Sequence, residues 1–372
     1  AMPHRPAFAL RRSARSFADG PAGEGLAAGA ASSLDFERLP ESPGEAAWWL
    51  PRRGGAQADG DGSRGRALTM KLLRAKDDVA STAVIDFFRG DKLFNSLAKR
   101  ELEQIRQRDA EDAEKLRAGI AKAIAKGVLP QGLKAPRYES VKIDGKTADE
   151  VAQKIIDRLP KGAGCVVVLV GLSGTGKGTT VSKLQAKLPG STAWSNGNCF
   201  RSLTLLAARH CELNGKGDFD PACLTPENIG SWIRMLDFEK IDGEWDIRIR
   251  GLGIDEKVSD IKSTLLMEAK VAKNIPAVAE ETQGEVVQFA ADACERMGDA
   301  GVVVLVEGRE QTLDFVPSPC RFRLEVADPG AVGARRAAQR VVAEALRRAE
   351  SSGAHLNVEA LLRAALAAVA AT

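Results

Sequence analysis

Several features that mark particular classes of protein are scarce in this sequence. No apolar run approaches the roughly 18 residues that a membrane span needs, so we expect no transmembrane segment. Lys and Arg total 53 against 50 Asp and Glu, and this near balance gives no reason to expect a nucleic-acid partner or an anionic membrane. Only three histidines are present, which disfavours a zinc site.

Cysteine is present, but without the spacing of a metal or redox motif. None of the six cysteines belongs to a CxxC pair, and Cys165 begins an apolar run typical of a buried strand. We therefore expect reduced thiols in an intracellular protein. The chain has 372 residues, of which 44% are hydrophobic, and this is enough for one sizeable α/β domain and a smaller element.

The first 66 residues are rich in Ala, Gly, Arg and Ser and show no lasting hydrophobic periodicity. Their first 18 positions contain four arginines and no acidic residue, which is typical of an organellar transit peptide. A disordered leader without a targeting role is the alternative. We therefore expect a cytoplasmic protein, or a plastid or mitochondrial one if residues 1–66 are a transit peptide.

Residues 67–145 are predicted to form a helical extension. Apolar residues share helix faces through a heavily charged segment, and the pattern ends at Gly127 and Pro130. Two interpretations of residues 71–127 are open. The segment is either an arm that binds a protein partner or oligomerises, or an extension packed on the domain that follows, and the packed extension is the simpler of the two.

The strongest local signal is the stretch 165–180, CVVVLVGLSGTGKGTT. Its apolar and largely β-branched run, Val166–Val170, predicts a buried strand of a parallel sheet. Four residues after it have the GxxxxGK spacing of a phosphate loop: Gly171, Gly174, Gly176 and Lys177. Glycines let backbone N–H groups point inward at an anion, and the next helix adds the partial positive charge of its N-terminus. The stretch therefore predicts a nucleotide-phosphate site.

The loop departs from the consensus at one position. A Ser or Thr metal ligand normally follows the lysine, whereas this chain has Gly178. We therefore expect Mg²⁺ to be held mainly through phosphate oxygens and water, with Glu307 orienting that water shell. The residues expected to bind ATP are Gly171, Ser173, Gly174, Thr175, Gly176, Lys177, Gly178, Thr179 and Thr180.

More motifs follow the loop in a definite order. The hairpin signal among them consists of a turn dipeptide flanked by alternating apolar residues. The motifs are NGNCFR at 196–201, the turn Asp242-Gly243 within 236–260, the strand end EGRE at 307–310, and Arg335, Arg336 and Arg340 after a last predicted strand.

With the GKGT of the phosphate loop, these motifs resemble the cytidylate kinase branch of the nucleoside monophosphate kinases, over about 165–365. NGNCFR is similar to the family's S-G-A-x-Y-R element, EGRE to its D-G-R-D strand end, and the late arginines to its lid helix. The resemblance implies an α/β P-loop fold, in which a parallel sheet flanked by helices carries a small antiparallel acceptor-binding insert and a lid. Residues 146–372 would form this domain, with the insert at about 212–285.

The resemblance also implies an activity, the ATP-dependent phosphorylation of a nucleoside monophosphate, CMP or dCMP. ATP and Mg²⁺ would be the cofactors, and small-molecule nucleotides the partners. The catalytic residues would be Lys177, Arg309, Arg335 and Arg336. The acceptor would be bound by Asn196, Gly197, Arg201, Gly308, Arg309 and Glu310.

The chain departs from this family on the acceptor side. Phe200 replaces the family's tyrosine, Ala279 lies where an arginine is expected, and the family's late Asp/Arg-rich segment has no counterpart. Two alternatives follow. The GLSG opening of the loop also resembles adenylylsulfate kinase. The missing acceptor-side residues leave open a weak or inactive nucleotide-binding pseudokinase with a structural or regulatory role, although a weak kinase is the preferred interpretation.

Overall fold

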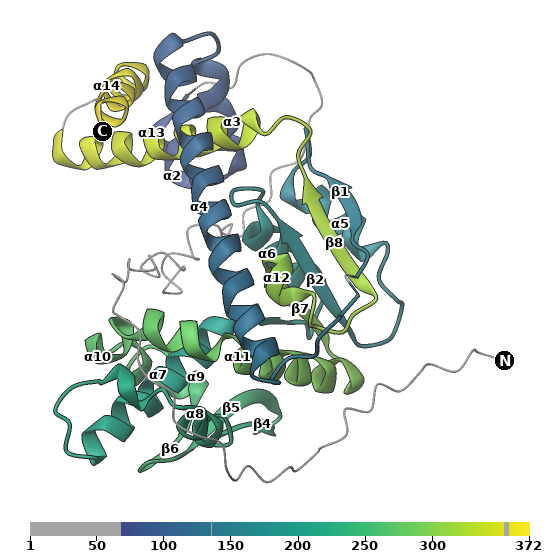
Figure 1. Cartoon of the computed structure of the whole chain (residues 1–372). Helices are drawn as coiled ribbons and strands as arrows, with labels where there is room; N and C mark the ends of the chain where they lie inside the picture. Colours follow the sequence, from purple (N-terminus) through teal and green to yellow (C-terminus); the bar gives the residue numbers. More distant parts are fainter. Residues whose placement is uncertain (1–67, 135, 353–356) are drawn as a thin grey trace. The chain divides into compact units, whose positions relative to one another are not determined.

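The computed structural model describes residues 68–134, 136–352 and 357–372 (Figure 1). The predicted leader, 1–66, and its targeting role lie outside these residues. In the part of the chain that is described, no helix is both long and apolar enough to cross a membrane.

A five-stranded, wholly parallel sheet carries the fold (Figure 1). Its strands run in the order β1-β8-β2-β7-β3, so the strand that leads into the phosphate loop is the middle one. The predicted α/β class with a parallel sheet is confirmed. The strands are β1 (Glu139–Lys142), β2 (Cys165–Gly171), β3 (Thr192–Trp194), β7 (Val303–Gly308) and β8 (Cys320–Glu325).

The middle strand β2 is apolar on both faces because helices cover both faces of the sheet. Its even-numbered valines pack in one cluster with α7 (Asn196–Leu213) and α11 (Ile275–Asp299). Its odd-numbered residues point to the opposite face and pack with α5 (Ala148–Ile156) and α6 (Lys177–Lys187). The near-continuous apolar run in the sequence thus follows from burial on two sides.

Strand β1 was not anticipated from the sequence. It has four residues and one buried side chain, Val141, whose partner in the parallel ladder is Leu324 of β8. A segment this short with one buried position carries no detectable periodicity. The strand lies within 67–145, so part of the predicted helical extension belongs to the central sheet.

The predicted antiparallel insert is present as a three-stranded sheet in the order β4-β5-β6. Asp242 and Gly243 form the turn between the first two strands with φ of 53° and 91°, as the favoured two-residue hairpin turn requires. The acceptor-binding role of this sheet stays a prediction. The insert and its neighbouring helices are η3 (Pro221–Cys223), α8 (Pro226–Ile233), β4 (Leu236–Ile241), β5 (Glu244–Gly251), β6 (Ile254–Lys257), α9 (Val258–Ile261), η4 (Leu265–Met267) and α10 (Ala269–Ala272).

Helices from both ends of the described chain share a second hydrophobic core. Phe94 and Leu97 near the start of α4 lie in this cluster with Val341 and Leu362, and the other end of α4 packs on α11. Residues 71–127 are therefore a packed extension, and a protein partner for them stays a prediction. The helices of this layer are α2 (Met70–Ala75), α3 (Asp78–Phe87), α4 (Lys92–Ala125), α13 (Gly330–Ser352) and α14 (Val358–Ala371).

Helix α13 comes very close to α4 at Gly333. A Cβ at this position would lie 2.2 Å from the carbonyl oxygen of Ala98 and 2.9 Å from the Cβ of Leu102. Two turns further on, Arg340 donates to the carboxylate of Glu101, which is itself buried. The close approach and the ion pair together fix α13 on α4.

We expect Gly333→Ala to lower the free energy of unfolding by about 1–3 kcal/mol, the usual cost of overpacking. The added methyl group must displace the backbone of α4 rather than a flexible side chain. Gly230→Ala is the control, because its Cβ would meet only the end of Arg234, 3.6 Å away, and alanine is favoured over glycine inside a helix. Urea unfolding measures both variants, and wild-type stability of Gly333→Ala would contradict the close approach.

Candidate functional site

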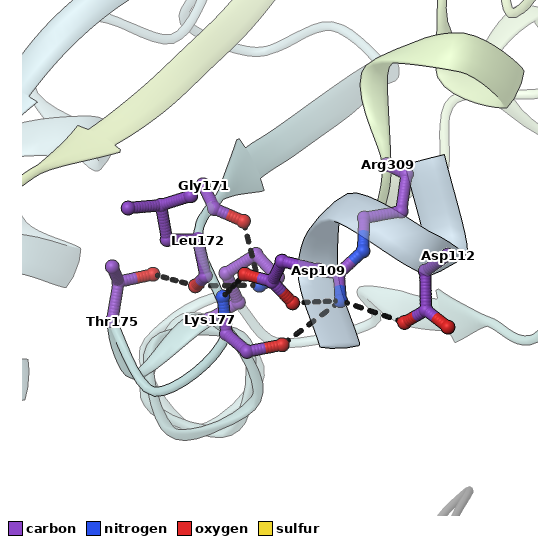
Figure 2. Close-up of polar contacts among 8 residues, drawn as sticks. Asp109, Asp112, Gly171, Leu172, Thr175, Lys177 and Arg309 are labelled. Carbon is purple, nitrogen blue, oxygen red and sulfur yellow. Dashed lines mark hydrogen bonds and ion pairs between the residues drawn. The ribbon is translucent and has the colours of Figure 1, made fainter. Parts of the chain in front are cut away.

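The phosphate loop connects β2 to α6 at the carboxyl edge of the sheet, where open α/β sheets bind ligands. Gly174 and Gly176 have φ of 79° and 81°, which residues with a side chain rarely adopt. Helix α6 begins at Lys177, so the positive end of its dipole lies at the loop. Lys177 Nζ donates to the carbonyls of Gly171 at 2.9 Å and Leu172 at 3.1 Å (Figure 2). The lysine thus lies folded onto the loop.

A pocket of about 480 Å³ lies over this loop, a volume within the usual range of small-molecule sites. Residues 173–182 line it from the loop and α6, Glu307 lines it from β7, and Arg335 from α13. All of the predicted ATP-binding residues except Gly171 are part of the lining. The structure therefore brings Lys177, Glu307 and Arg335, which are far apart in the sequence, into one pocket.

The pocket changes the ionisation of Lys177. Burial, together with the positive charge of Arg309, lowers its pKa from the ordinary value to about 8, while the carboxylates of Glu307 and Asp109 act in the opposite direction. Near and above this pH the ammonium form is therefore less populated than that of a lysine in water. An anionic ligand would favour the charged form again, because a nearby opposite charge stabilises it.

Glu307 stands beside the position where the consensus loop carries its metal-ligating hydroxyl. A Cβ built on Gly178 would lie 3.4 Å from Glu307 Oε1. Solvent reaches the carboxylate through the pocket, yet the surrounding protein raises its pKa by desolvation, against the effect of Lys177 and Arg309. Among the described residues, no group of three or more His, Cys, Asp or Glu side chains could hold a metal ion. A metal at Glu307 would therefore need ligand and water oxygens as well.

Arg309 lies just before α12 (Glu310–Leu313) and is held by α4 (Figure 2). Its Nη2 donates to Asp109 Oδ1 at 2.6 Å and to Ser173 Oγ at 2.8 Å, and it lies 3.3 Å from Asp112 Oδ2. Asp109 Oδ2 also accepts the backbone N–H of Ser173 at 2.7 Å. Sequence reasoning missed Asp109, because nothing local distinguishes it from the other charged residues of α4.

The other predicted acceptor residues lie outside the pocket lining. Arg201 is 7% exposed, and its Nη1 donates to the carbonyl of Leu266 in η4 at 3.2 Å. Asn196 accepts an indole N–H at 2.7 Å, and Glu310 accepts from Arg323 at 2.7 Å. The two glycines of this set are the second residue of α7 and the last residue of β7. The two arginines predicted to grip one phosphate are thus held by different elements, η4 and α4.

Of the arginines expected in the lid, Arg335 lines the pocket, whereas Arg336 is exposed and Arg340 is paired with α4. Helix α13 reaches the loop in its first turn, where a Cβ on Gly174 would lie 2.7 Å from Val332 Cγ1. The helix that carries these arginines is therefore packed on both the loop and α4.

No protein-family model and no curated protein matches the chain. Lys177, Arg335 and the N-terminus of α6 supply positive charge around the loop. Glu307 supplies a carboxylate on the same pocket. This arrangement can bind a polyanion together with a metal ion carried by that polyanion.

We expect the affinity of the pocket for a polyphosphate, measured with ATP, to fall as the pH rises above about 8, the pKa of Lys177. Bound phosphates favour the charged ammonium, so binding takes up a proton there and weakens by up to about tenfold per pH unit. Lys177→Arg is the control, since a guanidinium stays charged. Calorimetry between about pH 7 and pH 9.5 spans this titration. If the affinity of the wild type depends on pH as little as that of Lys177→Arg, Lys177 is not the group whose titration weakens binding.

Proposed function

We propose that this chain is an ATP- and Mg²⁺-dependent nucleoside monophosphate kinase with CMP or dCMP as its acceptor. The observation that carries the proposal is the one pocket that joins the phosphate loop to Lys177, Glu307 and Arg335. Phosphoryl transfer needs little covalent chemistry from the protein, because positioning and charge neutralisation account for most of the catalysis. The residues of this pocket would supply both.

The donor phosphates would lie on the loop. Lys177 would exchange its hydrogen bonds to the carbonyls of Gly171 and Leu172 for bonds to phosphate oxygens. Thr179 and Thr180 line the same pocket at the start of α6 and would lie near the α-phosphate. Arg335 would approach the transferring group, whose negative charge its guanidinium would neutralise.

Glu307 would hold Mg²⁺ together with phosphate oxygens and water. Its Oε1 lies beside Gly178, where the missing side chain leaves room for a ligand, and Mg²⁺ prefers carboxylate and water oxygens. When bound, the ion would neutralise charge on the β- and γ-phosphates. The raised pKa of Glu307 is consistent with this role, since a cation would favour the ionised carboxylate.

One feature supports an acceptor with a phosphate, a second supports a pyrimidine through the resemblance, and a third argues that the acceptor is bound weakly. Arg309 uses only Nη2 for its contacts with the described residues, which leaves three of its five N–H groups for a phosphate. The resemblance assigns acceptor binding to an antiparallel insert, and such a sheet is present. Ala279 is buried on α11 and cannot replace the expected arginine, so we expect a slow kinase or one of relaxed specificity.

A nucleotide-binding protein without turnover is the second candidate. The observation that favours it is the engagement of both expected acceptor arginines by protein groups, Arg201 with a backbone carbonyl and Arg309 with two carboxylates. In that case ATP would bind on the loop, and the bound state would serve a structural or regulatory role. The two candidates differ in one measurable property, the transfer of the phosphoryl group.

We expect the purified chain to phosphorylate CMP and dCMP faster than UMP and AMP. We expect phosphoryl transfer by Lys177→Ala to be slower than that of the wild type by roughly 10²-fold or more, which is the usual effect of losing one preorganised charge. A coupled assay of ADP release measures this at saturating acceptor, with adenylylsulfate as an additional substrate. Equal rates of wild type and Lys177→Ala would reject the loop as the donor site. Tight ATP binding without turnover of any acceptor would favour the second candidate.

We expect Gly178→Ser to lower the Mg²⁺ concentration needed for half-maximal activity by about fivefold, equivalent to roughly 1 kcal/mol for one added polar contact. The serine Cβ would lie 3.4 Å from Glu307 Oε1, which is ordinary contact, and its hydroxyl would restore the consensus ligand. Gly178→Ala adds the same Cβ without a hydroxyl and should show no such gain. Activity is measured as a function of Mg²⁺ concentration for the wild type and both variants. Equal half-maximal concentrations in all three would place the metal away from Glu307.

A further inference from the structure

Asp109 of α4 links two parts of the site (Figure 2). Its Oδ2 accepts the backbone N–H of Ser173 in the phosphate loop at 2.7 Å, and its Oδ1 accepts from Arg309 Nη2 at 2.6 Å. Only 10% of the Asp109 side chain is exposed, so solvent does little to weaken these charge-assisted hydrogen bonds. One carboxylate therefore joins the donor loop to the residue that follows β7.

The helix that carries Asp109 is fixed on both sides of it. Toward its N-terminus, Ile105 is 5% exposed, and Glu101 is paired with Arg340 of α13. Toward its C-terminus, Ile120 packs in a cluster with α11. A helix held at both ends keeps the carboxylate of Asp109 at a constant position relative to the loop.

Arg309 uses a single nitrogen for its protein contacts. Nη2 meets Asp109 Oδ1, Ser173 Oγ and Asp112 Oδ2, whereas Nε and Nη1 make no hydrogen bond or ion pair with the residues that the structure describes. The side chain is 22% exposed. A guanidinium anchored at one nitrogen keeps its orientation and still has three N–H groups with which to bind a ligand.

We infer that Asp109 is a positioning residue for phosphoryl transfer, which anchors Nη2 of Arg309 against the phosphate loop and so presents Nε and Nη1 to the phosphate of the acceptor. The inference rests on the proposed function, because it requires an acceptor phosphate at Arg309. If Asp109 has this role, α4 contributes a functional residue to the site. Asp109 and Arg309 both lie next to the donor pocket and outside its lining, as groups that serve the acceptor must.

In an alternative role, the carboxylate of Asp109 would occupy the position of a phosphate on the loop and so prevent a ligand from binding there. Two observations argue against it. Asp109 does not line the pocket, and Lys177 donates to the loop carbonyls of Gly171 and Leu172, so the carboxylate does not take the place of the ligand at the lysine. The donor pocket stays open with Asp109 in its observed position.

Asp109→Asn tests the inference in the full chain, with Glu114→Gln as the matched control. Asparagine keeps the shape but removes the charge that anchors Arg309, whereas Glu114 is an exposed acidic residue on the same helix. We expect Asp109→Asn to bind ATP within about threefold of the wild type, while kcat for CMP falls roughly tenfold or more and KM rises. Glu114→Gln should match the wild type in all three quantities.

A double variant separates positioning from a purely structural role. If Asp109 acts through Arg309, Asp109→Asn combined with Arg309→Lys is no slower than Arg309→Lys alone. Additive losses would overturn the inference. Faster turnover or tighter ATP binding in Asp109→Asn would overturn it too, because that is the signature of a blocking carboxylate.

If the wild type phosphorylates no acceptor, the proposed kinase activity is rejected. The role of Asp109 can still be tested, by the binding of CMP. Calorimetry then measures the binding of CMP to the ATP-loaded chain. We expect Asp109→Asn and Arg309→Lys to weaken CMP binding by similar factors, with Glu114→Gln unchanged. Absence of CMP binding by the wild type, or binding that Asp109→Asn leaves intact, would overturn the role of Asp109.

Discussion

The register between β2 and β7 is the constraint on which the site depends. Leu169 pairs with Glu307 and Val170 with Gly308, so the two strands end at the same level of the sheet. The phosphate loop therefore leaves one strand beside the point where Arg309 follows the other. A slip of one residue would turn Glu307 to the opposite face of the sheet and would separate the carboxylate from the first turn of α6. The apolar pairs further down both strands hold this register.

Charges of both signs surround the loop, and they partly offset one another. Burial lowers the pKa of Lys177 and the positive charge of Arg309 lowers it further, while the carboxylates of Glu307 and Asp109 partly offset both effects. In a site built from cations alone, mutual repulsion and desolvation would have a larger free-energy cost.

Features that depend on a few neighbouring residues could be predicted from the sequence. Glycine spacing predicted the phosphate loop, and Asp242-Gly243 predicted the hairpin, because each requires positive φ at particular positions. Strand β1 and the contact of Asp109 with Ser173 could not be predicted, because both depend on how distant segments pack. The same holds for Arg201. Its place in the first turns of α7 follows from the sequence, but its burial comes from η4, which lies far along the chain.

Strand β1 has a consequence for how the molecule is made. It precedes the phosphate loop, yet its ladder partner β8 follows the antiparallel insert, and Glu139 pairs with Phe322. During synthesis β1 leaves the ribosome long before β8 does, and until then neither strand has this neighbour. Helices α2, α3 and α4 likewise cannot complete their hydrophobic core until α13 and α14 have been synthesised. Contacts this distant in sequence slow folding, so the pocket over the phosphate loop, which Arg335 of α13 also lines, forms late, only when nearly the whole described chain has been translated.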